Sequence, residues 1–196
     1  MSNHIVLFGK YLEPDQGDVV GRLSLRFQSG TLDIDELWES SSLSAEFLST
    51  FWGKFFPINK EAEVTSDIGK DEVHYICGEL LGNAIKFSFS PNYMIEICLY
   101  LHQSELRFYV TNSVNPAELE EFQSFIRKLL TENTQQLFVE QMEKNASEDS
   151  NESGVGYLTL INDYNVSVAW KFEGIEAGIQ SVTALARMPI VRKVLA

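Results

Sequence analysis

Apolar side chains recur at helical spacing through residues 71–88 and predict the helix around which the chain is organised. Its expected buried positions are Val73, Ile76, Cys77, Leu80, Ala84 and Phe87. Asp71 is a candidate N-cap. At about 100° per residue, Glu79, Asn83 and Lys86 lie within roughly 60° of one another beside this face. The helix therefore carries a carboxylate, an amide and an ammonium group at the margin of the core.

Alternating apolar residues predict strands on both sides of this helix. The expected strands are residues 4–12, 19–28, 94–101, 105–111, 166–173 and 179–187. The first two are separated by a loop rich in turn formers, and they are expected to form an N-terminal β-hairpin within residues 1–38. Two strands alone are marginally stable, so this hairpin needs a larger sheet or a second subunit, and a homodimer is one solution.

Helical periodicity also covers the segment before the central helix. Residues 31–57 are expected to form a short helix, capped by Asp33 or Asp35, and a second helix that ends at Pro57. Residues 117–144 predict a long helix, and the polar residues that follow, to 153, are expected to be a mobile linker. An apolar helix then begins after a Gly-x-Gly sequence.

Length and composition fit one α+β domain over residues 1–196. With 44% hydrophobic residues and 13 Phe, the chain can fill a core, and the elements predict a two-layer α/β sandwich with helices on one face of a mixed or antiparallel sheet. The formal net charge of −13 disfavours nucleic acid and anionic membranes as partners. No apolar run is long enough to span a bilayer. Cys77 and Cys98 are expected to be buried free thiols in a reducing cytoplasm.

Two motifs in order carry a family resemblance. The sequence Glu79-x-x-x-Asn83-Ala84-x-Lys86-x-Ser88 resembles the N-box of the GHKL superfamily, the histidine kinase-like ATPases of the Bergerat fold. Gly154-x-Gly156, followed by an apolar helix, resembles the second glycine box of that superfamily. The order of helices and strands also agrees over roughly residues 40–190. A Gly-x-Gly alone is common in turns, so the N-box carries most of the resemblance.

The resemblance implies a site for ATP and Mg²⁺. Asn83 matches the family residue that gives an oxygen to Mg²⁺, and Glu79 matches the residue that activates the attacking hydroxyl or water. Lys86 matches a basic position of kinase-type N-boxes and would face the phosphates. Gly154 and Gly156 would let backbone N–H groups approach those phosphates at a helix N-terminus.

The first glycine box departs from the family pattern. The family has Asp-x-Gly-x-Gly, whose carboxylate accepts a hydrogen bond from adenine, whereas this chain has Asn112-Ser113-Val114-Asn115-Pro116. Asn112 keeps an acceptor oxygen but is neutral and can also donate. Both glycines are absent, and Pro116 removes a backbone donor. Residues 117–153 take the place of the family's lid.

These features leave three hypotheses. The chain resembles small cytoplasmic regulators, the anti-sigma serine kinases and SiaB-type kinases, which act on a small STAS-like or anti-sigma-antagonist-like partner. The first hypothesis is an Mg·ATP-dependent serine/threonine protein kinase, favoured by Glu79 and Asn83. The second is a pseudo-kinase that works by docking a partner, favoured by the altered first glycine box. The third is a structural domain in which the polar ridge and the glycine pair are ordinary surface.

Overall fold

A six-stranded sheet forms the framework of the protein. The computed structural model describes residues 4–28, 30, 33–54, 64–66, 69–147, 154–175, 179–190 and 192–194. Its sheet is antiparallel throughout, in the order β1-β6-β7-β5-β4-β2. The strands are β1 Ile5–Phe8, β2 Val19–Gln28, β4 Met94–His102, β5 Glu105–Val114, β6 Ser167–Gly174 and β7 Gln180–Pro189. A separate two-stranded sheet pairs β3 Val64–Ser66 with β8 Arg192–Val194.

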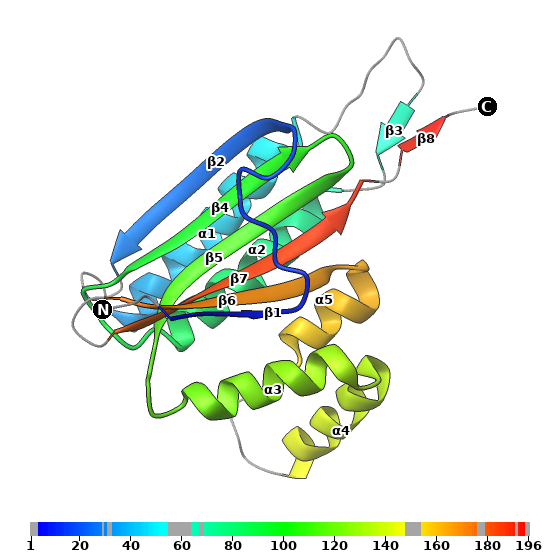
Figure 1. Cartoon of the computed structure of the whole chain (residues 1–196). Helices are drawn as coiled ribbons and strands as arrows, with labels where there is room; N and C mark the ends of the chain where they lie inside the picture. The colour runs from blue at the N-terminus through cyan, green and yellow to red at the C-terminus, as the bar shows by residue number, and fades with distance from the viewer. Residues whose placement is uncertain are drawn as a thin grey trace.

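The helices form a second layer against one face of this sheet (Figure 1). The helices in the described residues are α1 Ile34–Trp52, α2 Lys70–Lys86, α3 Leu119–Thr131, α4 Thr134–Ser147 and α5 Gly156–Tyr164. α2 packs on α1 and on the central strands β4 and β5, while α5 packs on α2 and β6. α3 reaches the β1–β6 edge of the sheet, where the rings of Phe122 and Phe172 pack edge to face with their centres 5.7 Å apart. The predicted two-layer α+β sandwich is confirmed.

Apolar side chains that point inward from alternate strand positions form the core between the sheet and the helices. Ile97, Phe108 and Trp170 face the helices from β4, β5 and β6, and each is fully buried. Ile76 and Leu80 of α2 are buried against them in the same cluster. Burial of each large apolar side chain is worth about 1.5–3 kcal/mol, so this contact fixes the rotation of α2 about its axis. That rotation determines where the polar ridge of α2 lies.

The two N-terminal strands do not form the predicted hairpin. Both exist, but β1 pairs with β6 and β2 pairs with β4, at opposite edges of the sheet. The chain joins them through residues 9–18, which we call the strap, and the strap crosses the sheet face that carries no helices (Figure 1). Gly9 starts this crossing with φ +71°, and a side chain there would collide with the carbonyl oxygen of Val168. Alternation predicts a strand but does not predict its pairing partner.

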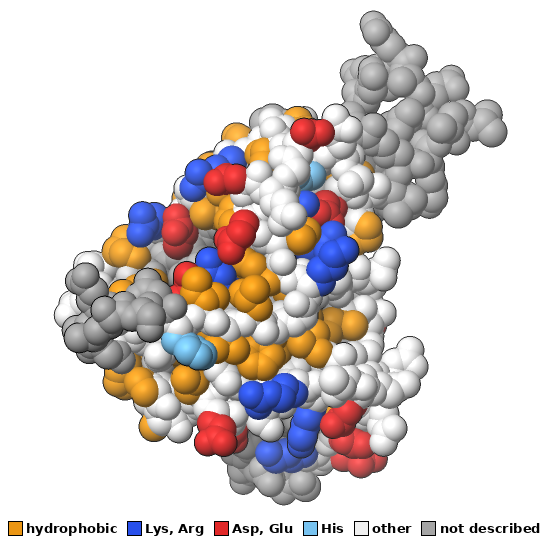
Figure 2. Space-filling model, viewed as in Figure 1, with side chains coloured by type: hydrophobic (Ala, Val, Ile, Leu, Met, Phe, Trp, Pro, Cys, Tyr) orange, Lys and Arg blue, Asp and Glu red, His pale blue; other side chains and the backbone are white. Residues whose placement is uncertain are grey.

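The strap covers a small second core. Tyr11 and Leu12 pack on a cluster made of Cys98, Tyr100, Tyr109, Ala169 and Leu185. The Tyr109 hydroxyl donates to the Leu12 carbonyl oxygen at 3.0 Å, and Arg107 Nη1 donates to the Gln16 carbonyl oxygen at 2.6 Å. Figure 2 shows this face as a mixture of hydrophobic and charged side chains. The strap thus covers apolar surface on the sheet face that carries no helices.

The predicted break between two helices in residues 31–57 is wrong. α1 is one continuous helix, and Ser44, expected with Ser42 as a possible cap of a second helix, lies inside it and donates to the Ser40 carbonyl oxygen. Its start does follow the prediction, since Asp33 forms a capping box with Glu36. The predicted end at Pro57 lies outside the described residues.

The other boundaries differ for local reasons. α2 begins at Lys70 with Gly69 at its N-cap, so Asp71 is inside the first turn. The predicted long helix is two helices, because Asn133 Oδ1 accepts the backbone N–H groups of Gln135 and Gln136 and so caps α4. Most of the expected linker before Gly154 lies outside the described residues.

The sequence predicted buried free thiols and no apolar segment long enough to span a bilayer. Cys77 and Cys98 are both free and buried, as expected. Among the described helices, none combines the length and the hydropathy needed to cross a bilayer.

The strap makes a stability prediction. Tyr109→Phe is expected to lower the free energy of unfolding by about 1–2 kcal/mol, because the Leu12 carbonyl oxygen loses its donor in a partly buried place. Urea denaturation measures this change. Tyr93→Phe, in the turn before β4, is the matched control and is expected to change stability by less than about 0.5 kcal/mol. Equal effects of the two variants would contradict the role given to the strap.

Candidate functional site

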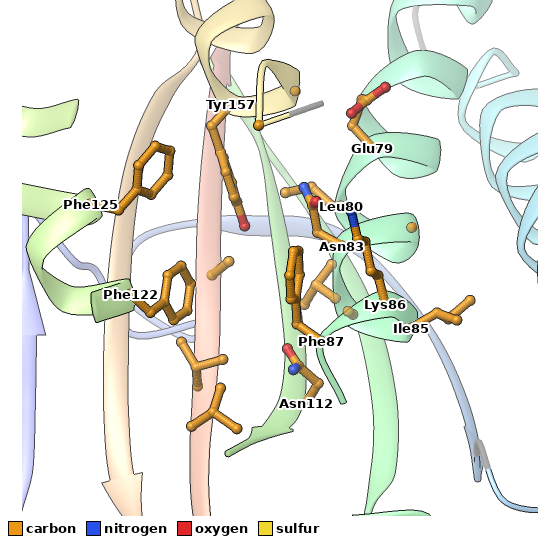
Figure 3. A pocket seen from close by; sticks show the side chains of 18 of the residues that line it. Glu79, Leu80, Asn83, Ile85, Lys86, Phe87, Asn112, Phe122, Phe125 and Tyr157 are labelled. Atoms are coloured by element: carbon orange, nitrogen blue, oxygen red, sulfur yellow. The ribbon is translucent and has the colours of Figure 1, made fainter. Parts of the chain in front are cut away.

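A pocket of about 1050 Å³ opens between α2, α5 and the inner face of the sheet (Figure 3). All six residues singled out in the sequence line it: Glu79, Asn83, Lys86, Asn112, Gly154 and Gly156. They come from α2, from β5 and from the start of α5. Pockets for cofactors commonly have several hundred Å³, so this one is large enough for a nucleotide. The structure therefore brings together residues that are far apart in the chain.

Glu79 lies half-buried at the end of the pocket next to α5. A Cβ at position 156 would collide with the Glu79 carboxylate and lie 3.7 Å from Asn83 Nδ2, so a side chain there would require the Glu79 carboxylate to move. Burial raises the pKa of Glu79, and a hydrogen bond with Tyr75 opposes part of that rise. A carboxylate in this state is more basic than an exposed one and can accept a proton from a nearby hydroxyl.

The glycine pair shapes the turn before α5. Gly154 has φ +55°, which L side chains rarely adopt, and a side chain there would press on the Gln141 amide of α4. α5 starts at Gly156 and has no side-chain cap at its N-terminus. Its first-turn N–H groups are available to an anion in the way that phosphate-binding helix starts use them.

Asn112 presents an acceptor to the pocket. It lies on the inner face of β5 opposite Val182, beyond the predicted strand end, and is buried. Its Nδ2 donates to the Ser113 carbonyl oxygen at 2.8 Å. Because that carbonyl can only accept, the amide orientation is fixed, and Figure 3 shows Oδ1 on the side of the pocket. The neutral amide thus leaves an acceptor oxygen toward the pocket.

Residues 112–116, which the sequence resemblance aligns with the first glycine box, form the end of β5 and the start of a hydrogen-bonded turn. Asn115 Oδ1 accepts the backbone N–H of Ala117 at 3.0 Å, and Asn115 Nδ2 donates to Glu118 at 2.9 Å. Ser113 Oγ accepts the N–H groups of Phe89 and Ser90, which joins the end of β5 to the chain after α2. Side-chain hydrogen bonds therefore hold this segment in place, although it contains no glycine.

Aromatic rings that sequence reasoning did not assign to the site line its deep part. Phe122 and Phe125 enter from α3 and Tyr157 from α5 (Figure 3). Burial raises the pKa of Tyr157 to about 12, so its hydroxyl stays protonated. Phe87 was predicted to be in the core, but it is 47% exposed and lines the pocket mouth. Helical spacing marked these residues as apolar but could not tell a core from a pocket wall.

The charged groups of the pocket are mixed. Lys86 of α2 lies with Nζ 5.3 Å from the Phe87 ring centre, and Lys144 of α4 lines the same pocket. Lys144 was missed because the long polar helix offered no motif. Glu118 and Glu121 contribute negative charge at the α3 side. The two lysines and the start of α5 would attract an anionic ligand, whereas the carboxylates of Glu79, Glu118 and Glu121 would oppose it.

Comparison with known proteins supports the fold. The crystal structure of the SiaB–SiaC complex from Pseudomonas aeruginosa contains a chain that matches with a TM-score of 0.57 and 11% identity, over 84% of this chain and 89% of that chain. No family model matches the sequence, and no curated protein matches it. At this identity the likeness shows the fold alone, and it confirms the predicted SiaB-type architecture at that level.

The glycines give a paired stability prediction. Gly154→Ala is expected to lower the free energy of unfolding by about 1–2 kcal/mol, because alanine is strained at positive φ. Gly78→Ala is the contrasting control: a Cβ there meets open space on α2, so better helix propensity is expected to add about 0.5–1 kcal/mol. Denaturant titration of the two variants measures both signs. A stable Gly154→Ala protein would show that the turn tolerates a side chain.

Proposed function

We propose that the protein is a signalling regulator of the GHKL type that binds Mg·ATP in this pocket and phosphorylates a serine or threonine of a small partner protein. The observation that carries the proposal is the convergence of Glu79, Asn83, Lys86, Asn112 and the glycine pair on one pocket, in a fold shared with a chain of the SiaB–SiaC complex. These six residues come from the two motifs and from the altered first glycine box, which are three separate segments of the chain. Such segments would rarely converge on one pocket by chance.

The residues present fit ATP and Mg²⁺. Glycine at position 156 lets the Glu79 carboxylate lie close to the start of α5, and Asn83 offers an amide oxygen of the kind that Mg²⁺ accepts. Asn112 Oδ1 offers the acceptor for an adenine amino group, and Phe122 and Tyr157 offer apolar contact for a base. When bound, Mg²⁺ would neutralise phosphate charge that the acidic protein would otherwise repel.

The roles of the side chains follow from their chemistry. Glu79 would take the proton of the partner hydroxyl as that oxygen bonds to the terminal phosphorus, and ADP would leave as the phosphate bridge breaks. Lys86 and Lys144 would hold the phosphates from two sides. Catalysis of this kind consists mainly of positioning and charge neutralisation, so a short list of residues is sufficient.

A specific observation keeps the docking hypothesis as a second candidate. Residues 112–116 contain no glycine: Ser113 and Val114 belong to β5, and Pro116 and the bonded Asn115 side chain fix the turn that follows at the pocket wall. A rigid turn there would limit nucleotide entry, and a regulator could then act by docking alone. In either case the likeness to a chain of the SiaB–SiaC complex supports a small partner protein, for which we propose a STAS-like or anti-sigma-antagonist-like domain.

Binding of Mg·ATP separates the two candidates. The wild-type melting temperature is expected to rise with millimolar Mg·ATP, because a ligand that binds only the folded state stabilises it. Asn83→Ala is expected to abolish this rise, whereas Asn92→Ala, in the exposed turn before β4, is expected to keep it. A wild-type protein without any rise would exclude the kinase and leave the docking module.

Glu79→Gln tests the general base. The variant is expected to keep Mg·ATP binding but to lose phosphoryl transfer to the partner by about a hundredfold or more, measured with labelled ATP. Its melting temperature without nucleotide is expected to rise, because the raised pKa of Glu79 means that burying its charge costs stability at neutral pH. Glu120→Gln on the exposed face of α3 is the matched control. Unchanged transfer in Glu79→Gln would assign the base elsewhere.

A further inference from the structure

The strand β2 forms one margin of the large sheet, and its outer edge has no strand beside it among the described residues (Figure 1). It is ten residues long, whereas β1 at the opposite margin has four. A bulge interrupts its pairing with β4 between Val19 and Gly21, and from Gly21 to Gln28 the register is unbroken. This regular stretch offers roughly 25 Å of strand edge. Every second residue there points its backbone N–H and C=O groups away from the sheet, where another strand can bond to them.

The face of β2 that points toward the helices is incompletely covered. Three of its apolar side chains pack on the main core but are only half-buried: Leu23, Leu25 and Phe27. The residues opposite them on β4 are completely buried: Leu99, Ile97 and Ile95. Apolar side chains of an added strand would lie beside the half-buried ones and remove more of their surface from water, which is the main favourable term in association.

The opposite face of β2 carries positive charge. Arg22 and Arg26 alternate with Ser24 there, and all three are exposed. Charged side chains protect an edge strand from pairing when they project past it. Here, however, both arginines lean inward over β4: Arg26 pairs with Glu96 at 3.6 Å, and the Arg22 guanidinium lies 5.2 Å from the centre of the Tyr100 ring. They therefore leave the backbone edge open, and β2 itself contains no carboxylate.

A second copy of this chain fits the edge poorly. Two antiparallel β2 strands would bring the arginines of both copies together on one face of the joined sheet. In the register centred on Ser24, Arg22 of one copy would lie opposite Arg26 of the other, and like charges in opposite positions destabilise a strand pair. A segment that carries carboxylates on this face would meet Arg22 favourably instead.

We propose that the β2 edge is a docking site for an extended segment of a partner protein in which apolar and acidic residues alternate. Backbone hydrogen bonds to the edge supply affinity, and the alternation supplies specificity, with apolar side chains beside Leu25 and a carboxylate near Arg22. The net charge of −13 repels an acidic segment at long range, but ions screen this repulsion beyond about 8 Å at physiological salt, so the contact with Arg22 acts locally. No residue of β2 lines the pocket, so the docking site is independent of nucleotide binding.

The probe is a synthetic peptide of about seven residues in which valine and glutamate alternate, which matches the regular stretch of β2 in length. Its binding to the full chain is expected to slow amide hydrogen exchange at alternate residues of β2 and to leave exchange in β1 unchanged, measured by NMR. A reference peptide has the same composition with its valines and glutamates in two blocks. It is expected to bind about fivefold more weakly or less, because only alternation places all the valines on one face.

Two charge reversals test the contribution of Arg22. Arg22→Glu is expected to weaken binding of the alternating peptide about fivefold, because an attraction becomes a repulsion at an exposed site. Arg127→Glu, on the exposed side of α3 near β1, changes the net charge equally and is expected to weaken binding less than about twofold. Both arginines are exposed, so both variants are expected to fold.

Four outcomes would overturn the proposal: no binding of the alternating peptide at millimolar concentration, equal weakening by the two reversals, equal binding of the two peptides, or slowed exchange in β1 instead of β2. A concentration-dependent dimer of the wild-type chain with slowed exchange in β2 would assign the edge to a second copy and would also overturn it. None of these results depends on Mg·ATP, so failure of this proposal is distinguishable from failure of the proposed kinase.

Discussion

The packing of α2 on the centre of the sheet is the contact on which the rest of the structure depends. Ile76 and Leu80 are buried against inward residues of β4 and β5, and this contact fixes the rotation of the helix. Because Glu79 and Asn83 lie next to the buried face, the same contact turns them toward α5 instead of toward solvent. The core and the candidate site are thus two consequences of one helix orientation, and neither can be moved without the other.

The arrangement of this site lowers the stability of the folded protein. Burial raises the pKa of Glu79, so its charged form is held at a cost, and Gly154 keeps a backbone conformation that other residues would strain. Gly78 and Gly82 add further cost, since glycine is a poor helix former. Unfavourable choices of this kind, gathered around one pocket, are typical of a functional site, where positioning outweighs stability.

Other segments of the chain cover the surfaces that α2 does not reach. The strap covers the sheet face opposite the helices, with Tyr109 and Arg107 bonded to its backbone carbonyl oxygens. On the pocket side, α3 brings Phe122 and Phe125, and a hydrogen-bonded turn after β5 leads into this helix. The bond of Asn112 to Ser113 leaves an acceptor oxygen toward the pocket.

Local pattern predicted the strands of the large sheet, the central helix and its polar ridge of Glu79, Asn83 and Lys86, because hydrophobic period is written in consecutive residues. Asn112, Gly154 and Gly156 were selected through the family resemblance, and the structure places them in the same pocket as the ridge. Contacts between distant segments decided the rest. β1 and β2 pair at opposite edges because β6 and β4 each have one strand edge that β7 and β5 leave unpaired, which no feature of the intervening loop encodes. Tyr157 and Lys144 became pocket residues only when α2, α4 and α5 met, since helical spacing assigns a side to each residue but not the neighbour that side will face.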